Sequence, residues 1–222
     1  SEGVKFLSNS LKELTGLKSI IINLENNRIR SEGAVNLSRG LKELTKLESL
    51  DINFRSSEIG DYGICYLSDA LKYLVKLNSL NIALRWNGIK NYGLKCLSNS
   101  IKNLTELNSL NIDLSCNEIR TDGIKELSET LKEIPELSSF DIDLSWNLIK
   151  DDGLKDLSYG LKELTKLKNL NLILSSNAIG NDGIEDLSKS LEKLTELTSL
   201  NINLCQNGIK KDDIEHLSKV LG

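Results

Sequence analysis

The sequence repeats itself every 30 residues, without insertions. A leucine or isoleucine opens each unit, at Leu11, Leu41, Leu71, Ile101, Leu131, Leu161 and Leu191. Seven full units therefore span residues 11–220, with the tail of another at 1–10 and the start of another at 221–222. A unit this short cannot bury its own apolar face, so stability has to come from stacking on its neighbours. The repeat predicts one continuous array over residues 1–222, which we expect to be part of a longer protein.

Each unit contains two different hydrophobic periods. In the fourth unit, apolar and polar residues alternate over residues 110–114, which is the period of a β-strand. Apolar residues then recur at steps of 3, 4 and 3 over residues 124–134, which is typical of an amphipathic helix. Thr121 and Asp122 stand at the predicted helix start, where we expect them to cap it. A glycine follows them in nearly every unit, and we assign it a role in the turn.

The order of these elements determines the expected architecture. Each strand is followed by a helix that returns the chain, so all the strands run in the same direction. Parallel strands lie about 4.8 Å apart, whereas packed helices need about 8–10 Å. The array therefore has to bend, with the strands inside. The sequence predicts an α/β solenoid with a parallel sheet on its concave face and helices on its convex face.

The pattern LxxLxIxLSxNxI, followed by a glycine and LxxxL, resembles the leucine-rich repeats. Segments such as LSCNEIRTDGIKELSETL and LSSNAIGNDGIEDLSKSL are similar to the ribonuclease-inhibitor-like subclass, in a 30-residue form resembling arrays in protist proteins. The resemblance implies a horseshoe-shaped solenoid. It also implies that an asparagine column bonds the backbone of adjacent turns, at Asn27, Asn87, Asn117, Asn147, Asn177 and Asn207. Ser57 replaces the asparagine in the second unit, so we expect a weaker rung there.

Composition limits the classes of partner. Lys and Arg number 28 against 32 Asp and Glu, giving a net charge of -4, which argues against nucleic acid. Membrane spans need about 18 consecutive apolar residues, and the sequence has no such run, so we expect no membrane partner. The four cysteines are Cys65, Cys96, Cys116 and Cys205. Their spacing matches no metal motif and no disulfide framework, and we interpret them as reduced thiols of a cytoplasmic protein.

The residues needed for catalysis do not occur together in this sequence. The single histidine, His216, leaves no Ser-His or Cys-His pair from which to build a nucleophile. The phosphate-binding pattern GxxxxGK[ST] and a spaced set of metal ligands are both missing. We therefore predict a protein that is not an enzyme, holds no cofactor and has no small-molecule substrate.

The variable positions are more informative about binding than the invariant ones. One column just past the strands contains both tryptophans of the chain: Asn26, Ser56, Trp86, Cys116, Trp146, Ser176 and Gln206. Arg55 and Arg85 precede this column, and Tyr62 and Tyr92 follow it. Tryptophan, tyrosine and arginine dominate the energetics of protein interfaces, so we predict a partner site here. The alternative is that the tryptophans pack against neighbouring turns.

A second candidate surface lies on the outward side of the strands. Short polar residues fill it, and Asp113, Asp141 and Asp143 give it an acidic centre that we include among the predicted binding residues. The alternative is that these residues only keep a tightly spaced sheet soluble.

These observations lead to a functional hypothesis with two rivals. The leading hypothesis is a non-catalytic scaffold that binds a protein partner of unknown identity, since solenoids offer extended surface and not a deep pocket. The first rival is a GTPase-activating regulator, by fold analogy with the Ran-activating leucine-rich repeat proteins. The second is a structural spacer, which buried tryptophans would favour.

Overall fold

Helices and strands alternate along the whole of the chain described by the computed structural model, residues 2–210. The helices in that range are α1 (Glu2–Lys12), α2 (Arg30–Leu41), α3 (Gly60–Leu71), α4 (Asn91–Ile101), α5 (Thr121–Lys132), α6 (Lys150–Leu161) and α7 (Asn181–Leu191). The strands are β1 (Ser19–Asn23), β2 (Ser49–Asn53), β3 (Ser79–Ala83), β4 (Ser109–Asp113), β5 (Ser139–Asp143), β6 (Asn169–Ile173) and β7 (Ser199–Asn203). His216 and the start of the last predicted unit lie outside the described residues.

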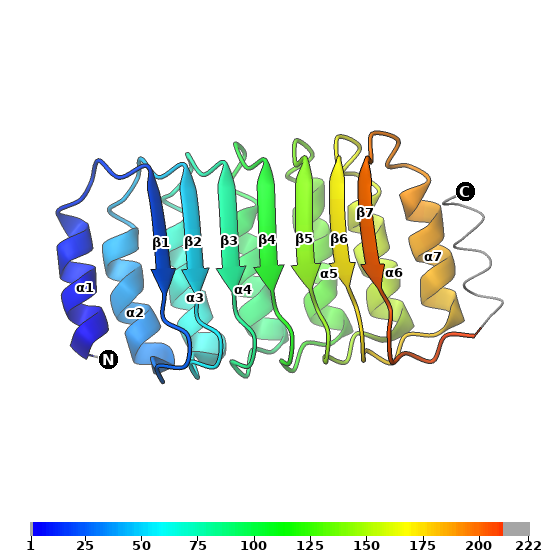
Figure 1. Cartoon of the computed structure of the whole chain (residues 1–222), viewed down its shortest axis with the longest axis horizontal. Helices are drawn as coiled ribbons and strands as arrows, with labels where there is room; N and C mark the ends of the chain where they lie inside the picture. Colours follow the sequence, from blue (N-terminus) through cyan, green and yellow to red (C-terminus); the bar gives the residue numbers. More distant parts are fainter. Residues whose placement is uncertain (1, 211–222) are drawn as a thin grey trace.

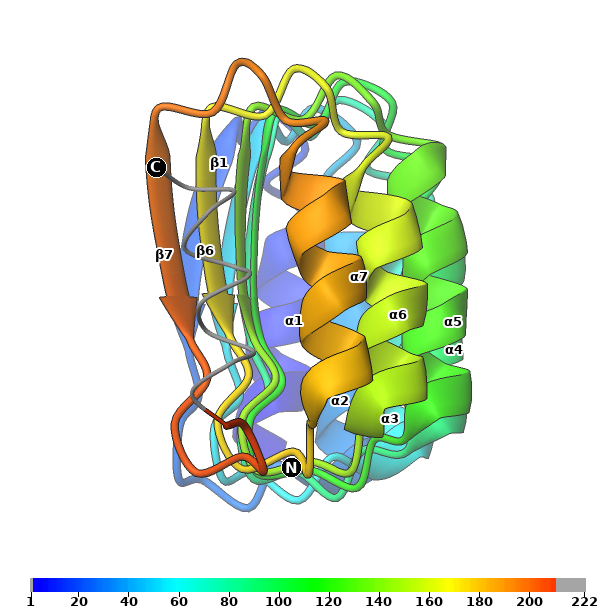
Figure 2. The ribbon, with the colours of Figure 1, turned by 90° about the vertical axis from the view of Figure 1, so that its right-hand side faces the viewer.

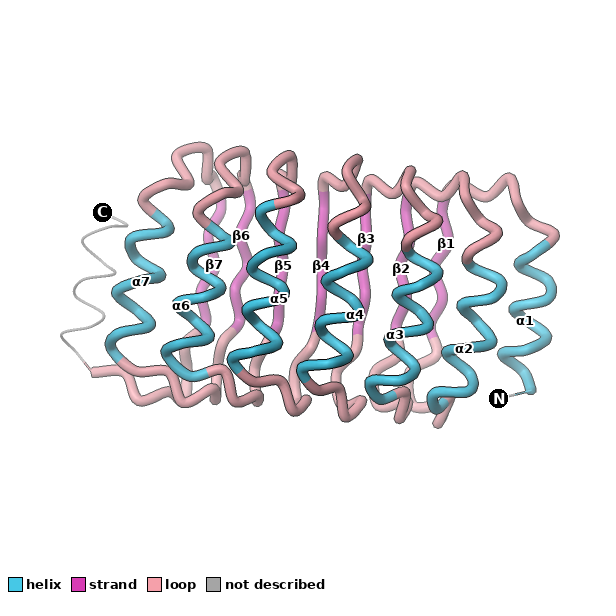
Figure 3. Tube along the Cα trace, turned by 180° about the vertical axis from the view of Figure 1, so that it is seen from behind, coloured by secondary structure: helices cyan, strands magenta, loops and turns pink. Residues whose placement is uncertain are grey.

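All the strands belong to one parallel sheet in the order β1-β2-β3-β4-β5-β6-β7. Each residue pairs with the residue 30 positions further on, as Leu110 does with Phe140. Figure 1 shows the strands in front of the helices, and Figure 2 shows the two layers end on. The helical row extends past the strand row at both ends, as an outer, convex layer must. Figure 3 shows the helical face from behind. The predicted α/β solenoid is confirmed.

The hydrophobic core is a continuous band between sheet and helices. In the middle of the array the inward strand residues Leu80 and Ile82 and the helix residues Leu94 and Leu97 are at most 1% exposed. Burying one such side chain stabilises a fold by about 1.5–3 kcal/mol. Because the same columns recur in every repeat, each unit completes the core of its neighbour.

The predicted asparagine ladder is present and joins the turns. From Asn87 onward, each asparagine amide bonds backbone groups of its own turn and of the turn before it, whereas Asn27, in the first unit, bonds only its own turn. Asn117 makes five bonds to backbone groups. Its Nδ2 donates to the carbonyls of Leu84, Leu114 and Ser115, and its Oδ1 accepts from the N–H groups of Asn87 and Ile89. The Ser57 hydroxyl only donates, to Leu24 and Arg55. The second rung is therefore weaker, as expected.

We expect the substitution Asn117→Ala to destabilise the protein more than Ser57→Ala. The first leaves buried carbonyl and N–H groups without partners and should lower the free energy of unfolding by about 2–4 kcal/mol. The second removes one donor and should cost about 1 kcal/mol. Urea unfolding followed by circular dichroism measures both. Equal losses of unfolding free energy in the two variants would contradict the prediction that the Asn117 bonds are stronger than those of Ser57.

Side chains of the preceding repeat bond the starts of α4, α5 and α7. The start of α5 receives no cap from its own side chains, so the predicted capping by Thr121 and Asp122 was wrong. The N–H of Arg120, which precedes α5, donates to Asn91 Oδ1 at 2.8 Å. The Thr121 hydroxyl instead donates to the carbonyl of Ile149 in the next repeat. Asn91 is the first residue of α4, so the side chain that bonds the start of α5 comes from the neighbouring helix, and Figure 3 shows these helices side by side.

The glycine column allows close helix packing, and the predicted turn role was wrong. Gly123 lies inside the first turn of α5. A Cβ at this position would lie 2.9 Å from Asn91 Oδ1 and 3.2 Å from Asn91 Cα. A side chain does not fit at Gly123, because α4 and α5 approach each other too closely there.

Two of the four cysteines form a disulfide, which corrects their interpretation as reduced thiols. Cys65 in α3 and Cys96 in α4 are bonded, with 5.0 Å between their Cα atoms. Their separation of 31 residues is one repeat plus one residue, so the solenoid places them on adjacent helices. Cys116 and Cys205 are free. Disulfides are typical of oxidising compartments, so this bond counts against the cytoplasmic location, which stays an untested prediction.

Thiol counting checks this bond directly. Alkylation of the unfolded, non-reduced protein should modify Cys116 and Cys205 only, and prior reduction should make all four cysteines reactive. Reduction should also lower the free energy of unfolding by roughly 3–4 kcal/mol, because the crosslink closes a loop of about 31 residues in the unfolded chain. Cys116→Ser serves as a control that should leave the effect of reduction unchanged. Four reactive thiols without reduction would contradict the disulfide.

Candidate functional site

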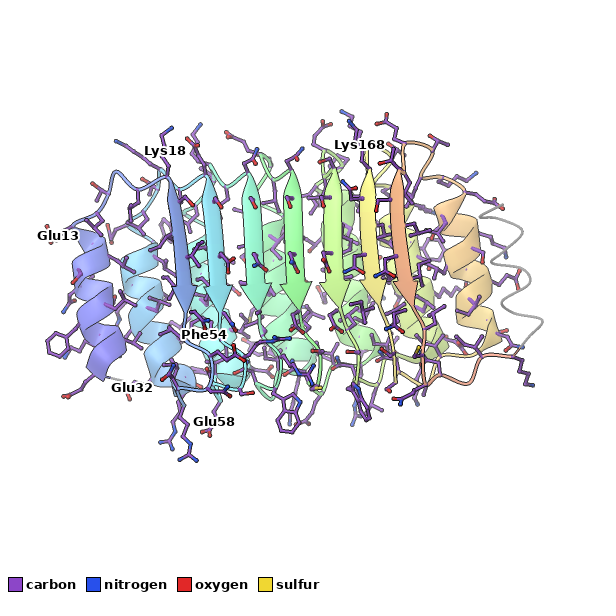
Figure 4. All side chains as sticks on the ribbon, viewed as in Figure 1. Glu13, Lys18, Glu32, Phe54, Glu58 and Lys168 are labelled. Carbon is purple, nitrogen blue, oxygen red and sulfur yellow. A yellow bond between two sulfur atoms is a disulfide. The ribbon has the colours of Figure 1, made fainter. Side chains whose placement is uncertain are left out.

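The turns that follow the strands form a continuous ridge along one edge of the sheet. We define the turn ridge as residues 25–30, 55–60, 85–90, 115–120, 145–150, 175–180 and 205–210. Figure 4 shows Glu58 of this ridge beyond the arrowheads of the strands, whereas Lys18 and Lys168 lie at the opposite edge. The backbone ladder continues into the ridge, since the N–H of Trp86 donates to the carbonyl of Ser115 at 3.2 Å. The backbone that carries the ridge side chains is therefore held by hydrogen bonds between neighbouring repeats.

Both tryptophans adopt a left-handed backbone conformation. Trp86 and Trp146 each have φ of 56°, and every member of their column has a positive φ. The positive φ recurs because the same turn is built in each repeat. For an L-residue with a bulky side chain this conformation costs about 1–2 kcal/mol, and asparagine or glycine would adopt it more easily. Tryptophan is thus a costly choice for the turn, and folding alone does not account for it.

The tryptophans are exposed. Trp86 is 62% exposed and Trp146 is 59% exposed, so the alternative that they pack against neighbouring turns was wrong. Cys116 lies between them in the same column and is half-buried. Leu148 is 47% exposed and was missed by the sequence reasoning. The signal was present, because Leu148 is the one large apolar residue in a column otherwise made of Arg28, Glu58, Gly88, Glu118, Ala178 and Gly208.

Two exposed tyrosines occupy a helix position that is otherwise acidic. The column contains Glu2, Glu32, Tyr62, Tyr92, Asp122, Asp152 and Asp182. An acid in the first turn is favourable because the helix N-terminus carries partial positive charge. Tyr62 and Tyr92 give up that benefit, and α4 has no acid in its first turn. Tyr62 contacts Tyr66 one turn along α3, with 3.1 Å between their hydroxyl oxygens, whereas Tyr92 is more exposed.

Arg55 and Arg85 have different surroundings. The Arg55 guanidinium crosses the intervening strand and pairs with Asp113, with 2.9 Å between Nη2 and Oδ2. The strand between them presents Ala83, whose short side chain leaves room for this crossing. Arg85 is half-buried and makes no ion pair or side-chain hydrogen bond with the rest of the described chain. Arg85 is therefore available to a partner, whereas Arg55 is already committed.

The predicted acidic centre is held by its own neighbours. Asp113 Oδ1 and Asp143 Oδ1 each accept the backbone N–H and the hydroxyl of the serine two residues later, Ser115 or Ser145. Asp141 Oδ1 accepts a hydrogen bond from Asn171 in the next strand. These contacts support the alternative that the polar residues of the sheet face serve the fold. The structure thus separates the predicted site into an exposed ridge and an engaged sheet face.

Comparison with known proteins identifies the repeat. A family model described as "Leucine Rich repeat" matches residues 102–128, 141–158 and 165–188. The chain folds as an α/β solenoid, and these segments are similar to leucine-rich repeats. Among solved structures 85 chains match, including "Leiomodin-1 Actin-Binding Site 2 (ABS2)", with a TM-score of 0.53 and 15% identity over 73% of this chain and 88% of that chain. At that identity the likeness concerns the fold alone. No curated protein matches the sequence.

Two other kinds of feature are absent between residues 2 and 210. Between residues 2 and 210, no helix is long and apolar enough to cross a membrane. The same part of the chain contains no group of three or more His, Cys, Asp or Glu side chains arranged to hold a metal ion. The turn ridge carries both tryptophans of the chain, and both are exposed.

The exposure of the tryptophans has a direct spectroscopic consequence. The tryptophan fluorescence of the native protein should have the long-wavelength maximum of water-exposed indole. Iodide should quench this fluorescence nearly as strongly as it quenches that of the unfolded chain. Replacing either Trp86 or Trp146 by alanine should change the free energy of unfolding by less than about 0.5 kcal/mol, because exposed side chains contribute little packing. Blue-shifted emission, or a loss of several kcal/mol in either variant, would contradict this placement.

Proposed function

We propose that this protein is a non-catalytic scaffold that binds a protein partner through the turn ridge, with the concave sheet face beside it. We also propose that the array belongs to the ribonuclease-inhibitor-like subclass of leucine-rich repeats. The partner-binding residues are Trp86, Trp146, Arg85, Tyr92 and Tyr62. Arg55, Asp113, Asp141 and Asp143 have a supporting role, since their side chains hold one another and the turns in place.

The exposure of two tryptophans in left-handed turn positions is the observation that carries this proposal. A solvated turn gains nothing from a bulky apolar side chain, and exposed aromatic residues on one edge are typical of an interface. The same observation disfavours a purely structural spacer, for which buried tryptophans were expected. For the GTPase-activating rival, the fold is the only support, and fold does not imply function.

The test is a pull-down with the native array and a ridge triple variant carrying Trp86→Ala, Trp146→Ala and Arg85→Glu. The native array should capture a protein partner from a lysate of cells that produce it. The ridge triple variant should lose that partner, because truncating an interface hot spot typically costs 2 kcal/mol or more in binding. The variant must first melt cooperatively at a temperature close to that of the native array.

A matched control carries changes of the same kind on the helical face: Tyr73→Ala, Tyr159→Ala and Lys42→Glu. All three positions are exposed there. The control should keep the partner. Retention of the same partner by the ridge triple variant would remove the turn ridge from the proposal, and capture of no protein by the native array would favour the spacer.

A further inference from the structure

The central part of the turn ridge combines exposed apolar side chains with unpaired positive charge. Residues 85–90, 115–120 and 145–150 contain four cations and one anion, in a chain whose net charge is -4. The anion, Glu118, pairs with Lys90. Arg85, Arg120 and Lys150 make no ion pair within residues 2–210. The charge that this surface presents to a partner is therefore positive.

We infer that this central ridge binds an acidic, extended peptide segment of the protein partner, with apolar side chains of that segment seated against Trp86 and Trp146. The inference rests on the proposed function and adds the chemistry of the partner. Charge complementarity carries it, because an acidic segment neutralises Arg85, Arg120 and Lys150 without having to break an existing ion pair.

Two helix starts beside the ridge carry a tyrosine where the other repeats carry an acid, so the negative charge is lower next to the aromatic residues. Tyr62 and Tyr92 replace the acid of that column in α3 and α4, whereas Asp122 and Asp152 keep it in α5 and α6. Asp61, the remaining acid at the start of α3, accepts the N–H groups of Lys90 and Gly93. An acidic segment thus meets the least repulsion next to Trp86, which is also where the surface is most aromatic.

The spacing of the tryptophans matches an extended partner. Trp86 and Trp146 are two repeats apart, which is about 9.6 Å at the spacing of parallel strands. A polyproline II segment has three residues per turn and rises about 3.1 Å per residue. Side chains three residues apart therefore project from one side of it, about 9.3 Å from each other. Such a segment lies along the ridge, across the direction of the strands.

A nucleic acid also carries negative charge and stacks on aromatic rings, but the surroundings favour a peptide. The sheet face next to the ridge carries Asp141 and Asp143, and the flanking helix starts carry Asp122 and Asp152. A continuous phosphate backbone would be repelled on both sides, whereas a peptide can place its few acids at the three cations. Single-stranded RNA is accordingly a competing outcome of the experiment.

The experiment selects binders from a displayed library of random 12-residue peptides on the native chain. Selected peptides are synthesised with a fluorophore and titrated against the native chain, a charge variant and a control, with binding measured by anisotropy. The charge variant carries Arg85→Glu, Arg120→Glu and Lys150→Glu. The control reverses three exposed lysines that lie outside the ridge, Lys42→Glu, Lys46→Glu and Lys193→Glu. Labelled single-stranded RNA is titrated in parallel.

The inference predicts peptides rich in Asp and Glu that carry two aromatic or aliphatic residues three positions apart. Their affinity should fall at least about tenfold on the charge variant, should stay within about twofold on the control, and should weaken as salt is raised. Trp86→Ala should also weaken binding, with the net charge of the ridge unchanged.

Selected peptides that are neutral or basic, or that bind the charge variant equally well, would overturn the acidic-segment inference and leave the proposed scaffold function standing. RNA that binds the native chain more tightly than any selected peptide, and loses binding on the charge variant, would also overturn it. Selection of no peptide would overturn it as well, and the pull-down then decides the proposed function independently.

Discussion

Backbone hydrogen bonding between equivalent residues of neighbouring repeats is the constraint on which the rest of this structure depends. The ladder holds the sheet in a register of 30 residues and does not stop where the strands end. It runs on through the turns, where the asparagine column adds side-chain bonds to further backbone groups. The column that contains Trp86 thereby takes the same left-handed conformation in every repeat. The left-handed position of Trp86 follows from its place in that ladder, whatever side chain stands there.

This constraint explains why the two candidate surfaces differ. On the sheet face, adjacent side chains are one strand spacing apart and satisfy one another, as Asp141 and Asn171 do. Arg55 reaches even further, across Ala83 to Asp113. On the turn ridge the backbone curves away from the sheet, and long side chains such as Trp86 have no neighbour to cover them. Exposed aromatic residues and unpaired cations therefore collect at the ridge, which is where an interface is expected.

Contacts between repeats also determine features that concern single residues. The starts of α4, α5 and α7 are bonded by side chains of the previous repeat, as Asn91 bonds the start of α5. Gly123 is required by the helix beside it, and Cys65 finds Cys96 on the next helix. Each of these features depends on residues about 30 positions apart in the chain. The pattern within a single unit suggests local turns, local caps and free thiols instead, and these expectations were wrong.

The sequence by itself determined the period, the alternation of strand and helix, the parallel sheet and the asparagine ladder, because these follow from patterns within one unit repeated without insertion. It also placed both tryptophans in one turn column. Only the tertiary structure decided that Trp86, Trp146 and Leu148 are exposed and that Asp113 is neutralised by Arg55. The physical reason is that exposure and pairing depend on what the neighbouring repeats place beside a residue, and spacing along the chain does not specify side-chain direction.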